Sequence, residues 1–396
     1  MEHPERMQLS HAPRLLLGAG PSNISPNVIR AMSAPMLSHL DPEFIGIMDD
    51  VTTMLRAVFG TTDGFTFPLS GTGHAGMEAA VANLLEPNDI LVSASNGYFG
   101  ERLSNVAERY GVDVHQVTGE WGKVLDLDAI EAELKLHDRV KALAVVHAET
   151  STGVLQPLDA VGELAHRYGA LLIVDAVTSF GGSRISVDDC NVDFAFSATQ
   201  KCLGGPPGLS PVFISKTAHQ VIANRTSPPA TWYLDVSLLQ GYWDGSARTY
   251  HHTAPITMVY GIWEALRSIL EEGLDACFER HQRNGIALRA GLRALGLDLL
   301  APEESFVPQL TTVFIPSGID DTAFRQKLLA KHNIEIGSGI GDFRGSIWRI
   351  GLMGENSTQA NVLLLLSAFE SLLPLWGFEV PIGGGVSAAS KIFSQR

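Results

Sequence analysis

Residues 171–177 read Leu-Leu-Ile-Val-Asp-Ala-Val. The four apolar residues predict a short strand buried on both faces, which is typical of a parallel sheet covered by helices. Outward from this run, further strands are predicted at Phe65–Leu69, Ile90–Ser93, Val112–Val117, Ala142–Val146, Phe194–Ser197 and Val212–Ile214. Helical spacing of apolar residues predicts helices at Phe44–Phe59, His74–Leu85, Arg102–Tyr110, Leu127–Leu136 and Leu158–Tyr168. This alternation predicts an α/β fold with a mostly parallel sheet between helices.

The pattern changes after about residue 250. Two long helices, Ile256–Glu272 and Leu274–Leu295, precede strand Thr311–Ile315, helix Asp321–His332, strand Ile347–Ile350 and helix Thr358–Leu373. We therefore expect a large domain at residues 14–270 and a smaller α+β domain at residues 271–380. Residues 1–13 are polar and contain two prolines, which predicts a flexible arm, and the Gly/Ser/Ala-rich residues 381–396 predict a flexible tail.

The composition narrows the classes of function. The 396 residues carry a formal net charge of −15 and are 45% hydrophobic, so the chain can bury a sizeable core. Binding to nucleic acid or to an anionic membrane surface is not expected, because both need clustered Lys and Arg. The cysteines Cys190, Cys202 and Cys277 fit neither a disulfide framework nor a zinc motif. We therefore expect a reducing compartment, the cytoplasm. Residues 1–10 lack the apolar core of a secretory signal, and the interrupted apolar segment 361–376 predicts a packed helix.

A glycine-rich turn follows the strand at Phe65–Leu69. Residues 70–76 read Ser-Gly-Thr-Gly-His-Ala-Gly and precede a predicted helix. Glycines let the backbone approach a ligand closely, and a helix N-terminus offers free N–H groups to an anion. The turn also fits the G-x-G-x-x-G dinucleotide pattern, but that pattern needs an acidic residue after the next strand, where residues 93–96 read Ser-Ala-Ser-Asn. A phosphate cup is favoured over an NAD site, and a simple tight turn remains an alternative.

Two charged residues follow predicted strands. Asp175 ends its strand at the sheet edge where α/β proteins bind ligands. A carboxylate there needs a cationic or donating partner, although a helix cap or a Mg²⁺ ligand would be alternative roles. Lys201 comes soon after the strand at Phe194–Ser197 and could attack an aldehyde if it is desolvated, the alternative being an ordinary surface lysine. A phosphate cup, an acid and a lysine in this order match the requirements of pyridoxal 5'-phosphate (PLP).

The motifs resemble those of a known family. The chain is similar from Arg14 to about Leu373 to class V aminotransferases of PLP fold type I, and among them to alanine–glyoxylate and serine–glyoxylate aminotransferases. The resemblance rests on 15–23 (Leu-Leu-Leu-Gly-Ala-Gly-Pro-Ser-Asn), the turn at 70–78, 147–154 (His-Ala-Glu-Thr-Ser-Thr-Gly-Val), 174–177, 200–201, 250–253 and 348–354. It implies a mostly parallel seven-stranded sheet in the large domain, with a smaller α+β domain after it.

The resemblance also implies roles for individual residues. Lys201 would carry PLP as a Schiff base and move protons. The other cofactor contacts would be Gly73 and His74 near the phosphate, Phe99 stacked on the ring, Thr150 as a hydrogen-bond donor, Asp175 at the ring nitrogen, Val177 on the other ring face and Gln200 at the phosphate. Tyr98 is the alternative to Phe99 for stacking. Tyr250 and Thr253 would come from a neighbouring subunit to close the phosphate site, so a homodimer is expected.

Substrate binding is expected at Arg349, because a guanidinium offers a two-pronged match to a carboxylate. A surface ion pair is the alternative role for this residue, and Asn23 could help to hold the same carboxylate. His251 and His252 are adjacent, so in an extended chain they would point to opposite faces. No metal site is predicted.

The expected activity is transfer of an amino group from a small L-amino acid, alanine or serine, to a small 2-oxo acid, with glyoxylate as the leading acceptor. Other amino donors such as 3-hydroxykynurenine, with glyoxylate or pyruvate as acceptor, remain open. An NAD-binding dehydrogenase, a cysteine desulfurase and a non-catalytic PLP-binding protein are rival interpretations. The desulfurase is disfavoured because no cysteine follows Cys277 to act as its nucleophile.

Overall fold

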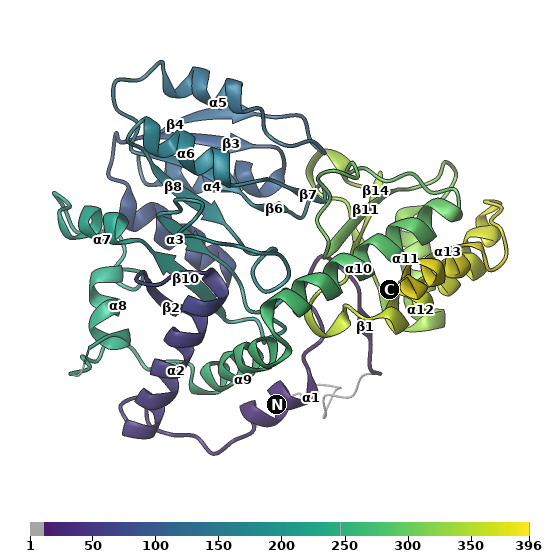
Figure 1. The fold of residues 1–396 in the computed structure, drawn as a ribbon, viewed down its shortest axis with the longest axis horizontal. Coiled ribbons are helices and arrows are strands. Elements are labelled where there is room, and N and C mark those ends of the chain that lie inside the picture. Colours follow the sequence, from purple (N-terminus) through teal and green to yellow (C-terminus); the bar gives the residue numbers. More distant parts are fainter. Residues whose placement is uncertain (1–11, 246, 396) are drawn as a thin grey trace, which may run out of the picture.

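The computed structural model describes residues 12–245 and 247–395. Residues 1–11 of the expected arm and Arg396 of the expected tail therefore lie outside the described residues. The centre of the fold is a seven-stranded sheet in the order β2-β10-β9-β8-β5-β3-β4 (Figure 1). Its strands are β2 (Phe65–Ser70), β3 (Ile90–Ser95), β4 (Asp113–Thr118), β5 (Ala142–Val146), β8 (Leu171–Asp175), β9 (Phe194–Phe196) and β10 (Leu209–Ile214).

The sheet is mostly parallel, as expected. Only β10 runs against its two neighbours, while the remaining pairings are parallel. Every residue of β5, β8 and β10 is buried, which explains their continuous apolar runs. The helices associated with this sheet are α1 (Pro26–Met32), α2 (Pro42–Phe59), α3 (Gly73–Leu84), α4 (Tyr98–Arg109), α5 (Leu127–Leu134), α6 (Asp159–Arg167), α7 (Lys216–Ala223), α8 (Val236–Trp243) and α9 (Ile256–Glu272).

Helix boundaries follow local capping. Ser25 caps α1 by accepting a hydrogen bond from the Val28 amide, with Pro26 in the first turn. Helix α2 begins after Asp41, whose side chain accepts from the Glu43 amide, and ends at Gly60, which adopts a left-handed conformation with φ 70°.

A second hydrophobic core forms around a three-stranded antiparallel sheet, β11-β14-β13, and gathers Leu288, Phe324, Trp348 and Phe369. Its elements lie at the right of Figure 1: α10 (Leu274–Ala294), β11 (Leu310–Phe314), α11 (Asp321–His332), β12 (Ile334–Glu335), β13 (Gly337–Ser338), β14 (Ile347–Gly351), α12 (Gln359–Leu372) and α13 (Gly384–Ser394). Short pieces complete the chain: β1 (Leu15–Leu16), β6 (Ala148–Glu149), β7 (Val154–Leu155), and the 3₁₀ turns Gly341–Phe343, Gly354–Asn356 and Leu373–Trp376.

The two cores do not divide at one point of the sequence. Strand β1 pairs with β12, and Leu17 is buried in the second core although the sequence assigned it to the large domain. Helix α10 contributes Cys277 to the first core and Leu288 to the second. The boundary expected at residue 270 falls inside α9, two residues before that helix ends, and stays a prediction.

The expected flexible tail is wrong for its described part. Helix α13 packs against α10 and α12, and Ala389 is fully buried. The Glu370 carboxylate accepts hydrogen bonds from the Gly385 and Val386 amides at the start of α13, at 2.9 and 3.1 Å. A carboxylate at a helix N-terminus is stabilised by the free N–H groups there, so tertiary contacts outweigh the low helix propensity of the glycines.

The apolar segment at Gln359–Trp376 satisfies the length and composition of a membrane span. In the fold, α12 buries Val362, Leu365 and Phe369 in the second core and packs against α10, α11 and α13. The structure therefore places this segment as a packed helix, as the sequence predicts.

Candidate active site

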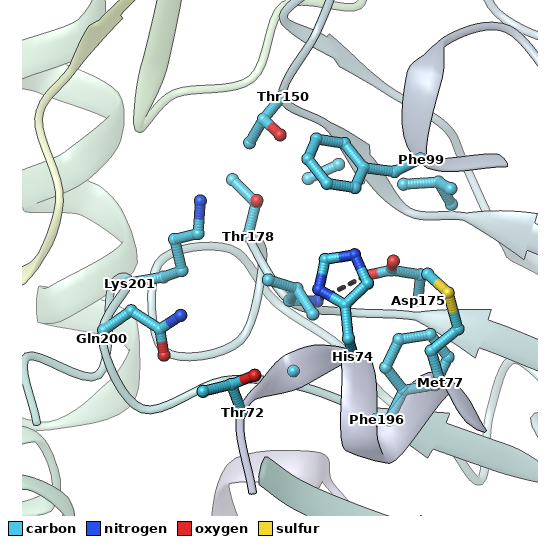
Figure 2. A pocket seen from close by; sticks show the side chains of 14 residues that line it. Thr72, His74, Met77, Phe99, Thr150, Asp175, Thr178, Phe196, Gln200 and Lys201 are labelled. Atoms are coloured by element: carbon cyan, nitrogen blue, oxygen red, sulfur yellow. Dashed lines mark hydrogen bonds between the residues drawn. The ribbon is translucent and has the colours of Figure 1, made fainter. Parts of the chain in front are cut away.

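The candidate active site is a pocket at the carboxyl edge of the large sheet. Val146, Asp175 and Phe196, the last residues of β5, β8 and β9, line it, in the position where parallel sheets bind ligands. The pocket measures about 630 Å³ with its mouth included, a size typical of small-molecule sites. It brings together eight residues expected from the sequence: Gly73, His74, Phe99, Thr150, Asp175, Val177, Gln200 and Lys201 (Figure 2).

Asp175 supplies a buried carboxyl group on one side of the pocket. Its Oδ1 accepts a hydrogen bond from the Val177 amide at 2.9 Å, drawn as the dashed line in Figure 2. Burial, with a smaller contribution from Glu149, raises the pKa of this carboxyl to about 7. Within residues 12–245 and 247–395, no cationic side chain hydrogen-bonds to it. A cation bound beside Asp175 would restore its ordinary ionisation.

Lys201 enters the pocket from the other side (Figure 2). Its Nζ donates a hydrogen bond to the Ala19 carbonyl. A Cβ on Gly20, where φ is +94°, would lie 2.6 Å from Lys201 Cδ, so only glycine allows this close approach. Burial, followed by the nearby charge of Arg349, lowers the pKa of the Lys201 amine to about 8. The lowered pKa leaves a larger fraction of this amine unprotonated and nucleophilic near neutral pH than in an ordinary lysine.

The start of α3 provides an anion site. Thr72 is its N-cap residue but makes no side-chain capping bond, which leaves amide groups at the helix start for a ligand. A Cβ on Gly73 would lie 3.0 Å from Val177 Cγ2 and 3.1 Å from Ala198 Cβ, so a larger residue would crowd the pocket floor. Gln200 lines the same pocket, and its buried Oε1 has no hydrogen-bond partner among the described residues.

Phe99 reaches the pocket because α4 starts at Tyr98, four residues before the predicted start at Arg102. The structure distinguishes the two aromatic residues expected as candidates for stacking on the coenzyme ring. Phe99 lines the pocket, whereas the Tyr98 hydroxyl accepts a hydrogen bond from Arg102 Nη2 at 2.6 Å and its ring is not part of the lining.

Glu149 is the site residue that sequence reasoning missed. Its buried carboxylate accepts hydrogen bonds from the Phe99 amide at 3.1 Å and from the Ser151 amide and hydroxyl at 2.9 and 2.7 Å. Burial raises the pKa of Glu149 above its usual range. Glu149 thus joins the first turn of α4, which carries Phe99, to the turn that carries Thr150. The sequence did contain a feature that could have identified Glu149, because this residue lies inside the 147–154 motif next to Thr150.

Arg349 approaches the pocket from β14 of the second core. Its Nε donates to the Ser338 carbonyl at 2.7 Å, and Nη1 reaches the carbonyl of pocket residue Thr150 at 3.3 Å. Burial lowers the pKa of its guanidinium. The alternative of a surface ion pair is wrong, because the side chain is largely buried and forms no ion pair within the described part of the chain.

Asn23 does not line the pocket, and its expected role at a substrate carboxylate stays a prediction. Its Oδ1 accepts from the Leu16 amide and its Nδ2 donates to the Arg14 carbonyl, both at 2.9 Å. The side-chain amide is therefore used to hold the N-terminal segment whose Ala19 and Gly20 contact Lys201.

Residues 250–253 lie outside the pocket lining. Tyr250 and Thr253 are exposed, so their expected role in a neighbouring subunit's site stays a prediction. His251 and His252 do not point to opposite faces as expected. Their Nδ1 atoms are 2.8 Å apart, and His252 Nε2 lies 2.6 Å from Ser70 Oγ. The chain bends at His252, so the alternation of an extended strand does not apply.

Comparison with known proteins agrees with this geometry. The family model of class V aminotransferases matches residues 14–343. The chain belongs to this family. This class V aminotransferase is 39% identical over 408 residues to (S)-ureidoglycine–glyoxylate transaminase of Bacillus subtilis (strain 168), with 98% of each protein covered.

Solved structures of similar proteins match the fold of this chain closely. Ureidoglycine–glyoxylate aminotransferase from Bacillus subtilis matches at 40% identity with a TM-score of 0.95, over 98% of this chain and 100% of the other. Alanine–glyoxylate aminotransferase from Nostoc sp. matches at 47% identity with a TM-score of 0.90, over 93% and 97%. The expected family, the fold of the PLP type I aminotransferases and the aminotransferase activity are confirmed, which removes the dehydrogenase alternative.

Proposed function

We propose that this aminotransferase uses PLP to move an amino group from a small L-amino acid, alanine or serine, to glyoxylate. One observation carries the proposal: a single pocket holds a desolvated lysine, a buried carboxyl and an uncapped helix N-terminus. These groups match the aldehyde, the ring nitrogen and the phosphate of PLP in turn.

The pocket fits the coenzyme on the observations of this structure. The amide groups at the start of α3 and the side-chain N–H groups of Gln200 would hold the phosphate. Asp175 needs a cation beside it, and a protonated ring nitrogen is one. Phe99 and Val177 both line the space for the ring, and Lys201 would hold the coenzyme through its aldehyde carbon. When bound, PLP supplies an electron-withdrawing ring that eases loss of the Cα proton of an amino acid.

Side chains of the protein supply proton transfer, substrate binding and positioning. Lys201, with a pKa of about 8, is suited to take a proton from Cα and return it at the other end of the transfer. Arg349 uses two of its N–H groups on the Ser338 and Thr150 carbonyls, which leaves donors for a substrate carboxylate. Glu149 holds the first turn of α4 through the Phe99 amide, so it acts as a positioning residue.

Relatives support the acceptor more firmly than the donor. The enzymes from Bacillus subtilis and Nostoc sp. both carry glyoxylate in their names, but one is named for ureidoglycine and the other for alanine. The match to the ureidoglycine enzyme covers 98% of each protein, so (S)-ureidoglycine is a second candidate donor beside 3-hydroxykynurenine. Exposed Tyr250 and Thr253 support a homodimer with shared sites, and the cytoplasm is the proposed location.

The test is a single-turnover measurement on the PLP-loaded enzyme. Alanine, serine, (S)-ureidoglycine and 3-hydroxykynurenine are each mixed with the enzyme, and the change in coenzyme absorbance is followed. Glyoxylate or pyruvate is then added to reverse it. We expect alanine or serine to react faster than (S)-ureidoglycine and 3-hydroxykynurenine, and glyoxylate to restore the spectrum faster than pyruvate. Failure of the protein to take up PLP, or indifference to glyoxylate, would overturn the proposal.

A further inference from the structure

Two histidines and a glutamate meet at the far edge of the large sheet, away from the pocket. His115 lies on the edge strand β4, Glu133 lies on α5, and His137 follows the end of that helix. One potential ligand atom from each lies within 4.8 Å of the others. None of the three lines the candidate active site, so aminotransfer does not explain the cluster.

The spacing suits a small divalent cation. Zinc binds nitrogen at about 2.0–2.1 Å and carboxylate oxygen at about 2.0–2.2 Å, which places tetrahedral ligands roughly 3.3–3.5 Å apart. Here His115 Nδ1 is 3.4 Å from Glu133 Oε1, and His137 Nε2 is 3.0 Å from the same oxygen. Small side-chain shifts would place one ion between the three groups.

A further carboxylate, that of Asp113, lies next to the second ring nitrogen of His115. Asp113 Oδ2 is 3.4 Å from His115 Nε2, and that buried nitrogen has no hydrogen-bond partner among the described residues. Metal-binding histidines commonly direct their second ring nitrogen to a carboxylate, which sets the tautomer and orients the ring. With Nε2 protonated and facing Asp113, the lone pair of Nδ1 is available toward Glu133 and His137.

We propose that His115, Glu133 and His137 bind one divalent transition-metal ion of the zinc type. Two imidazoles and a carboxylate are a common zinc set with an open fourth position. The side chains of His115, Glu133 and His137 are 31%, 24% and 14% exposed, so water can reach that position. The ion would fasten the edge strand β4 to α5. The sequence predicted no metal site because its ligands come from separate elements that only the fold brings together.

The experiment titrates Zn²⁺ alone into the chelator-treated, PLP-loaded enzyme by calorimetry, and Co²⁺ in parallel for its visible bands. We expect one ion per chain, with affinity at least tenfold weaker in His137→Ala and in Glu133→Gln and roughly 10–100-fold weaker in Asp113→Asn. His332→Ala, which removes a histidine of α11 outside the cluster, is the matched control and should bind as the natural chain does.

Two further measurements distinguish ligation from damage to the fold. Zn²⁺ should raise the melting temperature of the natural chain and of His332→Ala but not of the cluster variants. Glyoxylate-dependent activity without added metal should be unchanged in all variants, which shows that they fold. Absence of saturable one-per-chain binding, or equal Zn²⁺ affinity in the natural chain and both ligand variants, would overturn the proposal whatever the outcome for PLP.

Discussion

Replacing Asp175 by Asn should stabilise the coenzyme-free protein at neutral pH. The carboxyl of Asp175 is 3% exposed, and its pKa rises from 3.8 to about 7 in the folded chain. Between these values the folded state keeps a proton that the unfolded state has lost. The stabilisation is therefore complete below the unfolded pKa, and the free energy of unfolding falls as pH rises through the folded pKa. At about 1.4 kcal/mol per pH unit, the whole window corresponds to about 4 kcal/mol.

The assay is urea unfolding of the coenzyme-free natural chain and Asp175→Asn at pH 5 and pH 8. Asn can still accept the Val177 hydrogen bond but does not titrate. The natural chain should lose roughly 3 kcal/mol more than the variant between these pH values, because the variant carries every other titrating group. Equal pH dependence in both proteins would refute the burial argument.

Adding PLP should make the natural chain more stable than Asp175→Asn. A cationic ring nitrogen would restore ionisation of Asp175, whereas Asn offers no charge to pair with it. We expect the variant to bind PLP at least about tenfold more weakly, equivalent to about 1.4 kcal/mol. The PLP-loaded variant should then melt below the PLP-loaded natural chain. Undiminished PLP affinity in Asp175→Asn would show that this carboxylate does not face the ring nitrogen.

Three other predictions concern the neighbouring groups. Lys201→Ala should abolish steady turnover and the covalent hold on PLP, checked by absorbance and by reduction with borohydride; continued turnover would contradict its role. PLP uptake by the coenzyme-free protein should quicken as pH rises through about 8, where the Lys201 amine loses its proton; a flat profile in stopped-flow absorbance would contradict this. Arg349→Lys should raise KM for both substrates by about 10–100-fold with less effect on kcat, because an ammonium cannot make the two-pronged contact; an unchanged KM would remove Arg349 from the substrate site.

The sequence predicts the sheet and the residues at its carboxyl edge well because their positions follow from local sequence patterns. A short apolar run indicates a buried strand, and the polar residue that ends such a strand lies at the sheet edge. Asp175, the last residue of β8, was therefore placed at this edge from its own strand, whereas Lys201, five residues after β9, was singled out only together with the other motifs. The α3 turn was found in the same way as Asp175, since its glycines follow a strand directly.

Residues whose roles depend on distant partners were harder to predict. Asn23 has the right chemistry for a carboxylate, but the Leu16 amide and Arg14 carbonyl compete for its side chain. Glu149 stands next to a predicted contact, yet its role depends on the Phe99 amide, 50 residues away. Helix α13 has a flexible composition and becomes ordered only because Glu370 and α10 meet it. In each case the deciding contact lies outside any local window.

Arg349 and the contact that holds the Lys201 amine belong to the same packed body. The amide of Gly351, at the end of the strand that carries Arg349, donates to the Leu17 carbonyl at 2.8 Å. The Leu17 amide donates to Glu335, also at 2.8 Å, so the N-terminal segment is tied to the second core on both sides. Two residues further on, the Ala19 carbonyl accepts the hydrogen bond of Lys201. A carboxylate held by Arg349 would therefore lie on the same packed body as the carbonyl that accepts the hydrogen bond of the Lys201 amine.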